Sequence, residues 1–373
     1  MEVGSGAWSW FADPRAVVLR GLTYVGWIDG AGDVRVAELD QGAGMVTTAT
    51  LHAALGVNDH HNPALLARAD GRLQAFYSGH GGPELFFRIG ESIARWGPEQ
   101  RLGTNTPGAR GHTYPNPVQL RAEGDRIHLF WRGGDWNPTF STSADGVTWA
   151  PARTLIRVPG QRPYIKVASD GVETIHVAFT DGHPRETATS LYYARYTAGS
   201  WFRADGRRIG SSPFTPADAD LVSDVTRTGQ RAWVHDVAFD AAGVPRIVFA
   251  VFRSPTDHRY RHARWTGTAW QHRQVTQAGG TFPEDGRERE YSGGIVFDHA
   301  DPAVLYLSRQ VRGQWEIERW RTPDGGTSWS HQALTARSPE KNVRPVVARG
   351  GGPLWLRGPY VNYRRYRTVV VTD

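Results

Sequence analysis

Polar side chains recur in short segments of this 373-residue chain, each at the start of an apolar run. They are Asp13, Arg15, His60, His61, Tyr114, Asn116, Arg162, Lys166, His235, Asp236 and Arg344. Imidazole and phenol groups can transfer protons when their surroundings tune their pKa, and guanidinium groups bind carboxylates through paired hydrogen bonds. Acids are few, with Asp13, Asp59 and Asp236 the exceptions. The set therefore favours proton transfer on an anionic substrate over hydrolysis by paired carboxylates.

These segments open units that recur about every fifty residues, which is the spacing of propeller blades. The seven openings are residues 10–15, 58–63, 112–117, 162–166, 235–239, 291–295 and 342–346. Second apolar runs follow at 73–77, 127–131, 175–179, 247–252 and 304–307. Short apolar runs bounded by Gly and Asp are typical of buried strands. The pattern predicts an all-β fold, a seven-bladed β-propeller.

The first strand of each propeller blade lines the central channel, so the polar residues at the openings should converge near one mouth. Several charged groups on inner strands are hard to explain as packing, because buried charges require partners. The alternative is that ion pairs, such as Asp13 or Asp236 with an arginine, simply fill a wet channel. For any single residue the two interpretations have equal weight.

Two segments match the Asp-box turn, one at 143–149, which is one residue short, and one at 322–329 at full spacing. In such a turn the carboxylate, here of Asp145 or Asp324, accepts backbone N–H groups, and a glycine supplies the positive φ. The tryptophan that ends the motif packs between blades. We expect a structural role for both segments.

Length and composition indicate one domain spanning residues 1–373, because no linker or charge run divides the chain. No run of 18 apolar residues is present, so we expect no membrane partner. Cysteine is absent, which excludes disulfides and thiolate metal sites. The net charge of +6 favours a polyanionic partner. Since the basic residues are scattered singly, we expect an acidic polysaccharide rather than nucleic acid, bound by a monomer.

Cellular location and cofactors are less constrained. The chain starts Met1-Glu2-Val3-Gly4 without a signal segment. We expect a secreted or periplasmic protein whose leader is absent from this chain, with a cytoplasmic protein as the alternative. No cofactor is required. A structural calcium ion in the channel is an option, since Asp and carbonyl oxygens suit it, but no contiguous ligand motif supports it.

At the openings the sequence resembles the BNR-repeat propeller polysaccharide lyases, the group that includes ulvan lyases and rhamnosyl-glucuronate lyases. The segments that carry the resemblance are 59–60, 77–80, 114–117, 162–166, 179–185, 235–239, 291–295 and 315–320. Each is weak alone, and their order makes the resemblance strong over most of the chain. It implies a seven-bladed propeller that cleaves a uronate-containing glycan by β-elimination, either at a rhamnose-α-1,4-glucuronate linkage or in ulvan.

The resemblance also implies a catalytic site of two histidines, a tyrosine and an arginine. His60 and His80 match the family histidines, twenty residues apart, and Tyr114 and Arg132 match the other pair. His61 departs from the family pattern, in which asparagine is common. Residues 60 and 61 would point to opposite sides of a strand, and the spacing favours His60 as the one that faces the channel. The zinc site of some ulvan lyases uses cysteine and is not carried over.

β-Elimination requires a cation on the uronate carboxylate, a base for the C5 proton and an acid for the leaving O4. Arg132 suits the first role, with His80 as a second donor. Either Tyr114 acts as base and then acid, or His60 is the base and Tyr114 the acid, and the sequence leaves both open. The predicted substrate-binding residues are His61, Asn116, Arg162, Tyr164, Lys166, His183 and Arg344. Lys166 could equally be a structural ion-pair partner, and His183 a turn residue.

Three other functions compete with the lyase. A glycoside hydrolase of the α-L-rhamnosidase kind on the same fold is the leading rival. A sialidase would need an arginine triad, for which Arg15, Arg162 and Arg344 are candidates, but the flanking motifs do not resemble sialidases. A non-catalytic carbohydrate-binding propeller would not require the four catalytic candidates at this spacing.

Overall fold

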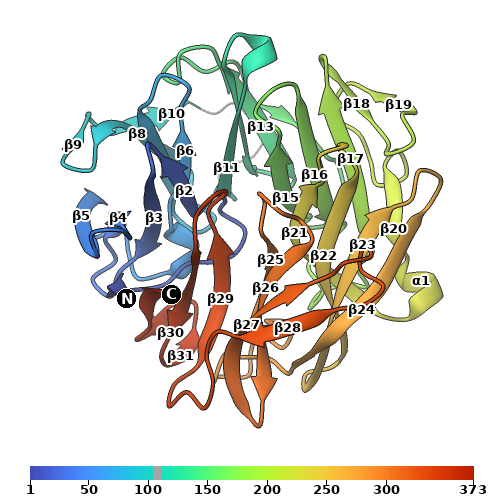
Figure 1. Cartoon of the computed structure of the whole chain (residues 1–373). Helices are drawn as coiled ribbons and strands as arrows, with labels where there is room; N and C mark the ends of the chain where they lie inside the picture. The colour runs from blue at the N-terminus through green and yellow to red at the C-terminus, as the bar shows by residue number, and fades with distance from the viewer. Residues whose placement is uncertain (104–110) are drawn as a thin grey trace.

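The computed structural model describes residues 1–103 and 111–373, which form seven antiparallel sheets arranged around a channel (Figure 1). The first blade consists of β2 (Ala16–Leu19), β3 (Leu22–Ile28), β4 (Val34–Asp40) and β5 (Met45–His52). The second consists of β6 (Ala64–Ala67), β7 (Leu73–Ser78), β8 (Leu85–Ser92) and β10 (Gln100–Leu102), with β9 (Arg95–Trp96) paired to β8. The third consists of β11 (Thr113–Leu120), β12 (Arg126–Arg132), β13 (Pro138–Ser143) and β14 (Arg153–Thr154).

The remaining blades complete the ring. They are β15 (Tyr164–Ser169), β16 (Thr174–Thr180), β17 (Leu191–Thr197), β18 (Ser200–Phe202) and β19 (Arg208–Gly210), with β20 (Asp220–Ser223) paired to β17; β21 (Arg231–Phe239), β22 (Pro245–Ser254), β23 (Asp257–Trp265) and β24 (Trp270–Gly279); β25 (Ile295–Phe297), β26 (Val304–Val311), β27 (Gln314–Arg321) and β28 (Ser330–Ala333); and β29 (Asn342–Val347), β30 (Pro353–Arg357), β33 (Val369–Thr372) and β1 (Glu2–Ser5). Outside the blades lie a 3₁₀ turn η1 (Asp59–His61), a second 3₁₀ turn η2 (Arg121–Glu123), a short helix α1 (Val225–Thr228) and a hairpin of β31 (Tyr360–Asn362) and β32 (Arg365–Tyr366). The predicted seven-bladed all-β propeller is confirmed.

The ring closes by pairing the two ends of the chain. β1 runs antiparallel to β33, with Ser5 opposite Val369, so the first residues supply the outer strand of the last blade (Figure 1). The opening pattern did not predict this pairing, because it started the first unit at residue 10. A closed ring leaves no gap between the first and last blades, which protects their strand edges.

The apolar runs predicted as second strands form the second strands of their blades. Every residue of β7 is buried, and β12 and β16 are buried apart from their first residues. The Asp145 turn has its carboxylate accepting the backbone N–H groups of Val147 and Thr148 at 2.7 Å each. Its tryptophan, Trp149, packs edge-on against Phe76 of the preceding blade at 5.7 Å between ring centroids.

The segment that joins β1 to β2 crosses the channel. Trp10 stacks on His235 with ring centroids 5.4 Å apart and contacts Tyr291 at 4.9 Å. Phe11 lies 4.6 Å from Tyr164, measured between centroids. Since these partners come from different blades, Trp10 and Phe11 fill the middle of the channel. We call this pair of residues the plug.

Among the described residues, no helix is long and apolar enough to cross a membrane.

Candidate active site

Two histidines meet face to face at the mouth where the inner strands begin. His60 lies in η1 just before β6, and His80 follows the end of β7. Their ring centroids are 4.0 Å apart and their planes differ by 11°. Asn58 caps η1 by accepting the backbone N–H of His60, and its side-chain nitrogen lies 3.4 Å from His80 Nδ1. The cap therefore positions both imidazoles.

The left-handed backbone conformation of Tyr114 directs its phenol toward these imidazoles. Tyr114 has a φ of +63°, next to a shift in the register between β11 and β12. Such a bulge re-aims a side chain at a strand end. The Tyr114 ring lies 5.5 Å from the His60 ring and 6.5 Å from the His80 ring, between centroids.

Arg132, the last residue of β12, lies over the phenol. Its guanidinium carbon is 4.9 Å from the Tyr114 ring centroid and 4.7 Å from that of Trp136. Its Nε donates to Gly111 O at 3.2 Å, and one Nη2 hydrogen goes to Thr113 Oγ1 at 3.0 Å. These contacts fix the plane of the fork. Further N–H groups remain for a ligand carboxylate.

Two of the predicted binding residues complete the cluster. The Tyr164 hydroxyl lies 3.5 Å from Arg132 Nη1, and the His183 ring contacts the Tyr164 ring edge-on at 5.4 Å. His183 Nδ1 accepts the backbone N–H of Arg185 at 3.1 Å, which places the imidazole proton on Nε2. At the rim Arg162 pairs with Glu186. His61 turns its Nδ1 to the carbonyl of Gly56 at 3.0 Å, so of the neighbouring pair it is His60 that faces Tyr114.

Three predicted substrate-binding residues are not brought to this cluster. Asn116 donates to the backbone oxygens of Phe11 and Tyr114 at 2.9 and 2.8 Å. Lys166 is buried against Asp13 and the carbonyl of Trp10. Arg344 is buried against Asp59 and the carbonyl of Trp8. All three predictions are corrected: these residues hold the chain around the plug. The sequence located the inner strands but did not show that residues 8–15 occupy the channel between them.

Tyr363 is a cluster member that the sequence did not indicate. It lies between β31 and β32, and its ring contacts His60 edge-on at 5.0 Å and His80 at 5.6 Å. Its carbonyl accepts the backbone N–H of Asp59 at 2.8 Å. The hairpin follows the last blade opening, so the repeat spacing gave no signal for it.

Burial sets the protonation of the site. It raises the pKa of Tyr114 well above its usual value of 10, with Tyr164 adding to the effect and Arg132 opposing it. Burial likewise lowers the pKa of His60 and His80, and lowers that of His183 to about 2. At neutral pH these three imidazoles are therefore neutral and the Tyr114 phenol is protonated. A small pocket lies against Tyr114, Arg132 and Tyr164, and the side chain of Trp136, at 38% exposed, reaches the surface.

Comparison with known families agrees with the fold. Residues 22–278, more than half of the chain, match the family described as BNR repeat-containing family member. The chain belongs to this family. No curated protein matches this BNR propeller in sequence.

Solved structures show the same fold. One, described as a new family of polysaccharide lyase, PL25 ulvan lyase, superposes with a TM-score of 0.77 at 16% identity, covering 99% of this chain and 94% of that one. The same lyase bound to -[GlcA(1-4)Rha3S]- gives 0.76 at 16% identity, covering 100% and 94%. Polysaccharide lyase Uly1 gives 0.63 at 12% identity, covering 97% and 90%. The BNR propeller thus has a fold used by polysaccharide lyases.

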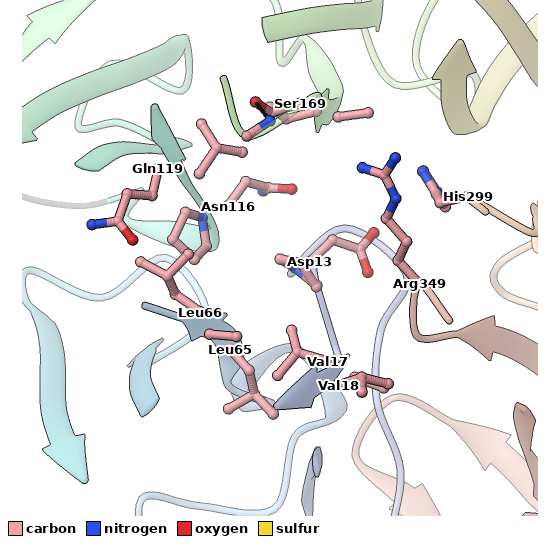
Figure 2. Close-up of a pocket in the computed structure, with 18 of the residues that line it drawn as sticks. Asp13, Val17, Val18, Leu65, Leu66, Asn116, Gln119, Ser169, His299 and Arg349 are labelled. Carbon is pink, nitrogen blue, oxygen red and sulfur yellow. Dashed lines mark hydrogen bonds between the residues drawn. The ribbon is translucent and has the colours of Figure 1, made fainter. Parts of the chain in front are cut away.

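The opposite mouth of the BNR propeller holds a separate cavity of about 610 Å³. Its walls are mostly apolar, with Val17, Val18, Leu65 and Leu66 on one side (Figure 2). His299 and Arg349 lie together on another side, and His299 Nε2 is 3.0 Å from Asp236 Oδ2. The plug separates this cavity from the histidine cluster.

Within residues 1–103 and 111–373, no group of three or more His, Asp or Glu side chains could hold a metal ion, and the calcium ion stays a prediction.

Proposed function

We propose that this BNR propeller is a polysaccharide lyase that cleaves the bond at C4 of a uronate by β-elimination. The observation that carries the proposal is the meeting of His60, His80, Tyr114 and Arg132 in one cluster. This reaction needs two groups that transfer protons and one guanidinium that binds the carboxylate. The ulvan lyases with the same fold support the reaction class.

Arg132 would bind the uronate carboxylate. Its plane is held by Gly111 and Thr113 and by the flanking rings of Tyr114 and Trp136. Pairing with a fixed cation withdraws charge from the carboxylate, so the neighbouring C5 proton becomes more acidic. His80, whose ring lies 6.5 Å from that of Tyr114, would add a second polar contact.

The protonation states favour His60 as the base and Tyr114 as the acid. A neutral imidazole accepts the C5 proton, whereas a phenol with a raised pKa stays protonated and can donate. The C5–H electron pair becomes the C4–C5 double bond, the C4–O4 bond breaks, and O4 takes the proton of Tyr114. In a glucuronate H5 and O4 lie on one face of the ring, which suits two groups that contact each other.

Hydrolysis has less support because the acids near the cluster are already engaged. Asp59 is fully buried and pairs with Arg344, and Glu186 pairs with Arg162 at the rim. A hydrolase would need two carboxyl groups on either side of the bond, with room for a water. We therefore propose an unsaturated uronate as the product, from a rhamnose-α-1,4-glucuronate linkage or from ulvan.

The test is incubation of the protein with gum arabic, arabinogalactan and ulvan. We expect the ultraviolet absorbance of an unsaturated uronate to appear with at least one glycan and to vanish in His60→Ala. Arg349→Ala, at the opposite mouth, is the matched control and should keep the activity. New reducing ends without absorbance would establish hydrolysis instead, and binding without either product would establish a carbohydrate-binding propeller.

A further inference from the structure

A buried carboxylate lies directly beneath the proposed base. Asp59 is 0% exposed and precedes His60 in η1. Its Oδ2 accepts from the guanidinium of Arg344 and from the hydroxyl of Tyr360. Its Oδ1 has no hydrogen-bond partner of good geometry among the described residues, but lies 2.7 Å from His60 Nδ1. The imidazole thus lies within ion-pair distance of this oxygen, and its Nδ1 also contacts Asn58 Oδ1.

The surroundings of His60 Nδ1 determine which nitrogen carries the proton. The Nδ1 atom faces two oxygens, Asn58 Oδ1 at 3.0 Å and Asp59 Oδ1 at 2.7 Å. A lone pair on Nδ1 would repel both, whereas an N–H can be shared between them. The neutral ring therefore has its proton on Nδ1 and a free lone pair on Nε2.

The charge on Asp59 is held in place by a caged cation. Arg344 is 1% exposed, and its guanidinium carbon lies 4.8 to 5.5 Å from four ring centroids, those of Trp10, Phe282, Tyr291 and Tyr360. Aromatic faces favour a buried cation. Burial alone would raise the pKa of Asp59, but Arg344 and His60 lower it to about 2. The carboxylate is ionised throughout the working range of an enzyme.

We propose that Asp59 is a positioning residue that keeps the His60 proton on Nδ1 and leaves Nε2 free to take the C5 proton. This inference rests on the proposed lyase function. It gives Arg344, expected from the sequence to bind substrate, the role of counter-ion to Asp59. Asp59 also stabilises the imidazolium that forms when His60 accepts the proton, as a negative charge beside a developing positive one does.

Removing the negative charge of Asp59 should change the pH dependence of kcat/KM as well as its maximum. The charged and titratable groups around His60 are Asp59, His61, His80, Tyr114, Arg132, His183, Arg344 and Tyr363. Asp59 raises the pKa of His60, while Arg344 and Arg132 lower it. In Asp59→Asn the acid limb of kcat/KM should move to lower pH, and the plateau should fall about 10²- to 10⁴-fold.

A pair of variants separates positioning from folding. Asp59→Asn leaves Arg344 buried without its counter-ion and should lower Tm. Asp59→Asn with Arg344→Met removes both charges and should regain much of that Tm without regaining kcat. Recovery of wild-type kcat in the double variant would overturn the proposal, because Asp59 would then serve only to neutralise Arg344. The matched control is Asp13→Asn with Lys166→Met, another ion pair with a buried cation, which should leave the pH profile unchanged.

The tautomer can be measured without any substrate. In protein labelled with ¹⁵N at histidine, the His60 signals are assigned by their loss in His60→Gln. We expect the shifts of a ring protonated at Nδ1 in the wild type and a changed tautomer mixture in Asp59→Asn. A wild-type ring protonated at Nε2 would overturn the inference. Since this readout needs no activity, failure of the tautomer and failure of the lyase reaction are separate results.

Discussion

Replacement of Tyr114 by phenylalanine removes the proposed acid and little else. Among the described residues no group hydrogen-bonds the Tyr114 hydroxyl, while the ring keeps its contacts with Phe11 at 5.4 Å and with the Arg132 guanidinium at 4.9 Å. The substitution therefore leaves no hydrogen-bond partner of this hydroxyl unsatisfied among those residues. We expect Tyr114→Phe to fold with a free energy of unfolding within about 0.5 kcal/mol of the wild type.

The expected rate loss follows from the protonation of the phenol. Because the pKa of Tyr114 lies well above 10, less than about 1% of the phenol is ionised at pH 8. It can serve as a donor but hardly as a base. Loss of a positioned acid costs about 10²- to 10⁴-fold in kcat, which corresponds to about 3 to 5.5 kcal/mol in the activation free energy.

The assay compares two leaving groups at C4 of the same uronate. A glycosyl oxygen needs a proton to leave, whereas fluoride leaves without one. With the glycan, followed by ultraviolet absorbance, Tyr114→Phe should lose the full factor. With a 4-deoxy-4-fluoro-glucuronate, followed by a fluoride electrode, it should stay within about threefold of the wild type, because the acid then contributes nothing. Tyr196→Phe, in β17 of the fourth blade, where the hydroxyl donates to Glu123, is the control and should match the wild type on both.

An equal loss on both substrates would refute the reasoning. It would mean that Tyr114 takes the C5 proton, as in the alternative where one phenol is base and then acid. Full activity of Tyr114→Phe on the glycan would remove Tyr114 from the mechanism altogether.

Three further outcomes are expected. The pH profile of kcat/KM should have an acid limb with a midpoint below 6.5, since the pKa of His60 is lowered from that value, and no loss up to about pH 9, since the pKa of Tyr114 is raised; a midpoint above about 7 would contradict this. Arg132→Lys keeps the charge but loses the paired hydrogen bonds, worth about 2 to 3 kcal/mol, so kcat/KM should fall about 30- to 150-fold in steady-state assays, whereas Arg349→Lys should change nothing. His262 is buried, and its pKa in the folded protein is lowered to about 3. As the pH falls, this histidine is protonated first in the unfolded chain, so the free energy of unfolding decreases below about pH 6.5. In urea titrations His262→Leu should lessen the decline between pH 6 and 4 by about 1.4 kcal/mol per pH unit, and an unchanged decline would exclude this cause.

The fold could be predicted because its signals are local. Apolar runs such as Leu73–Tyr77 repeat at blade spacing, and a turn such as the one at Asp145 is held by hydrogen bonds between neighbouring residues. The positions of His60 and Tyr114 at strand openings follow from the same repeat. Contacts between blades have no such period. Tyr363, which lies against both histidines, comes from a hairpin that belongs to no repeat.

By itself the sequence determined the seven blades, the strand openings and the residue types able to transfer protons and bind a carboxylate. The tertiary structure decided which polar residues of those openings lie in the histidine cluster. Residues 8–15 cross the channel, so Lys166 and Asn116 hold the plug, and Arg344 lies beneath Asp59. The physical reason is that a buried ion needs a partner wherever it lies, and for Arg344 that partner is Asp59, which is 285 residues away in the sequence.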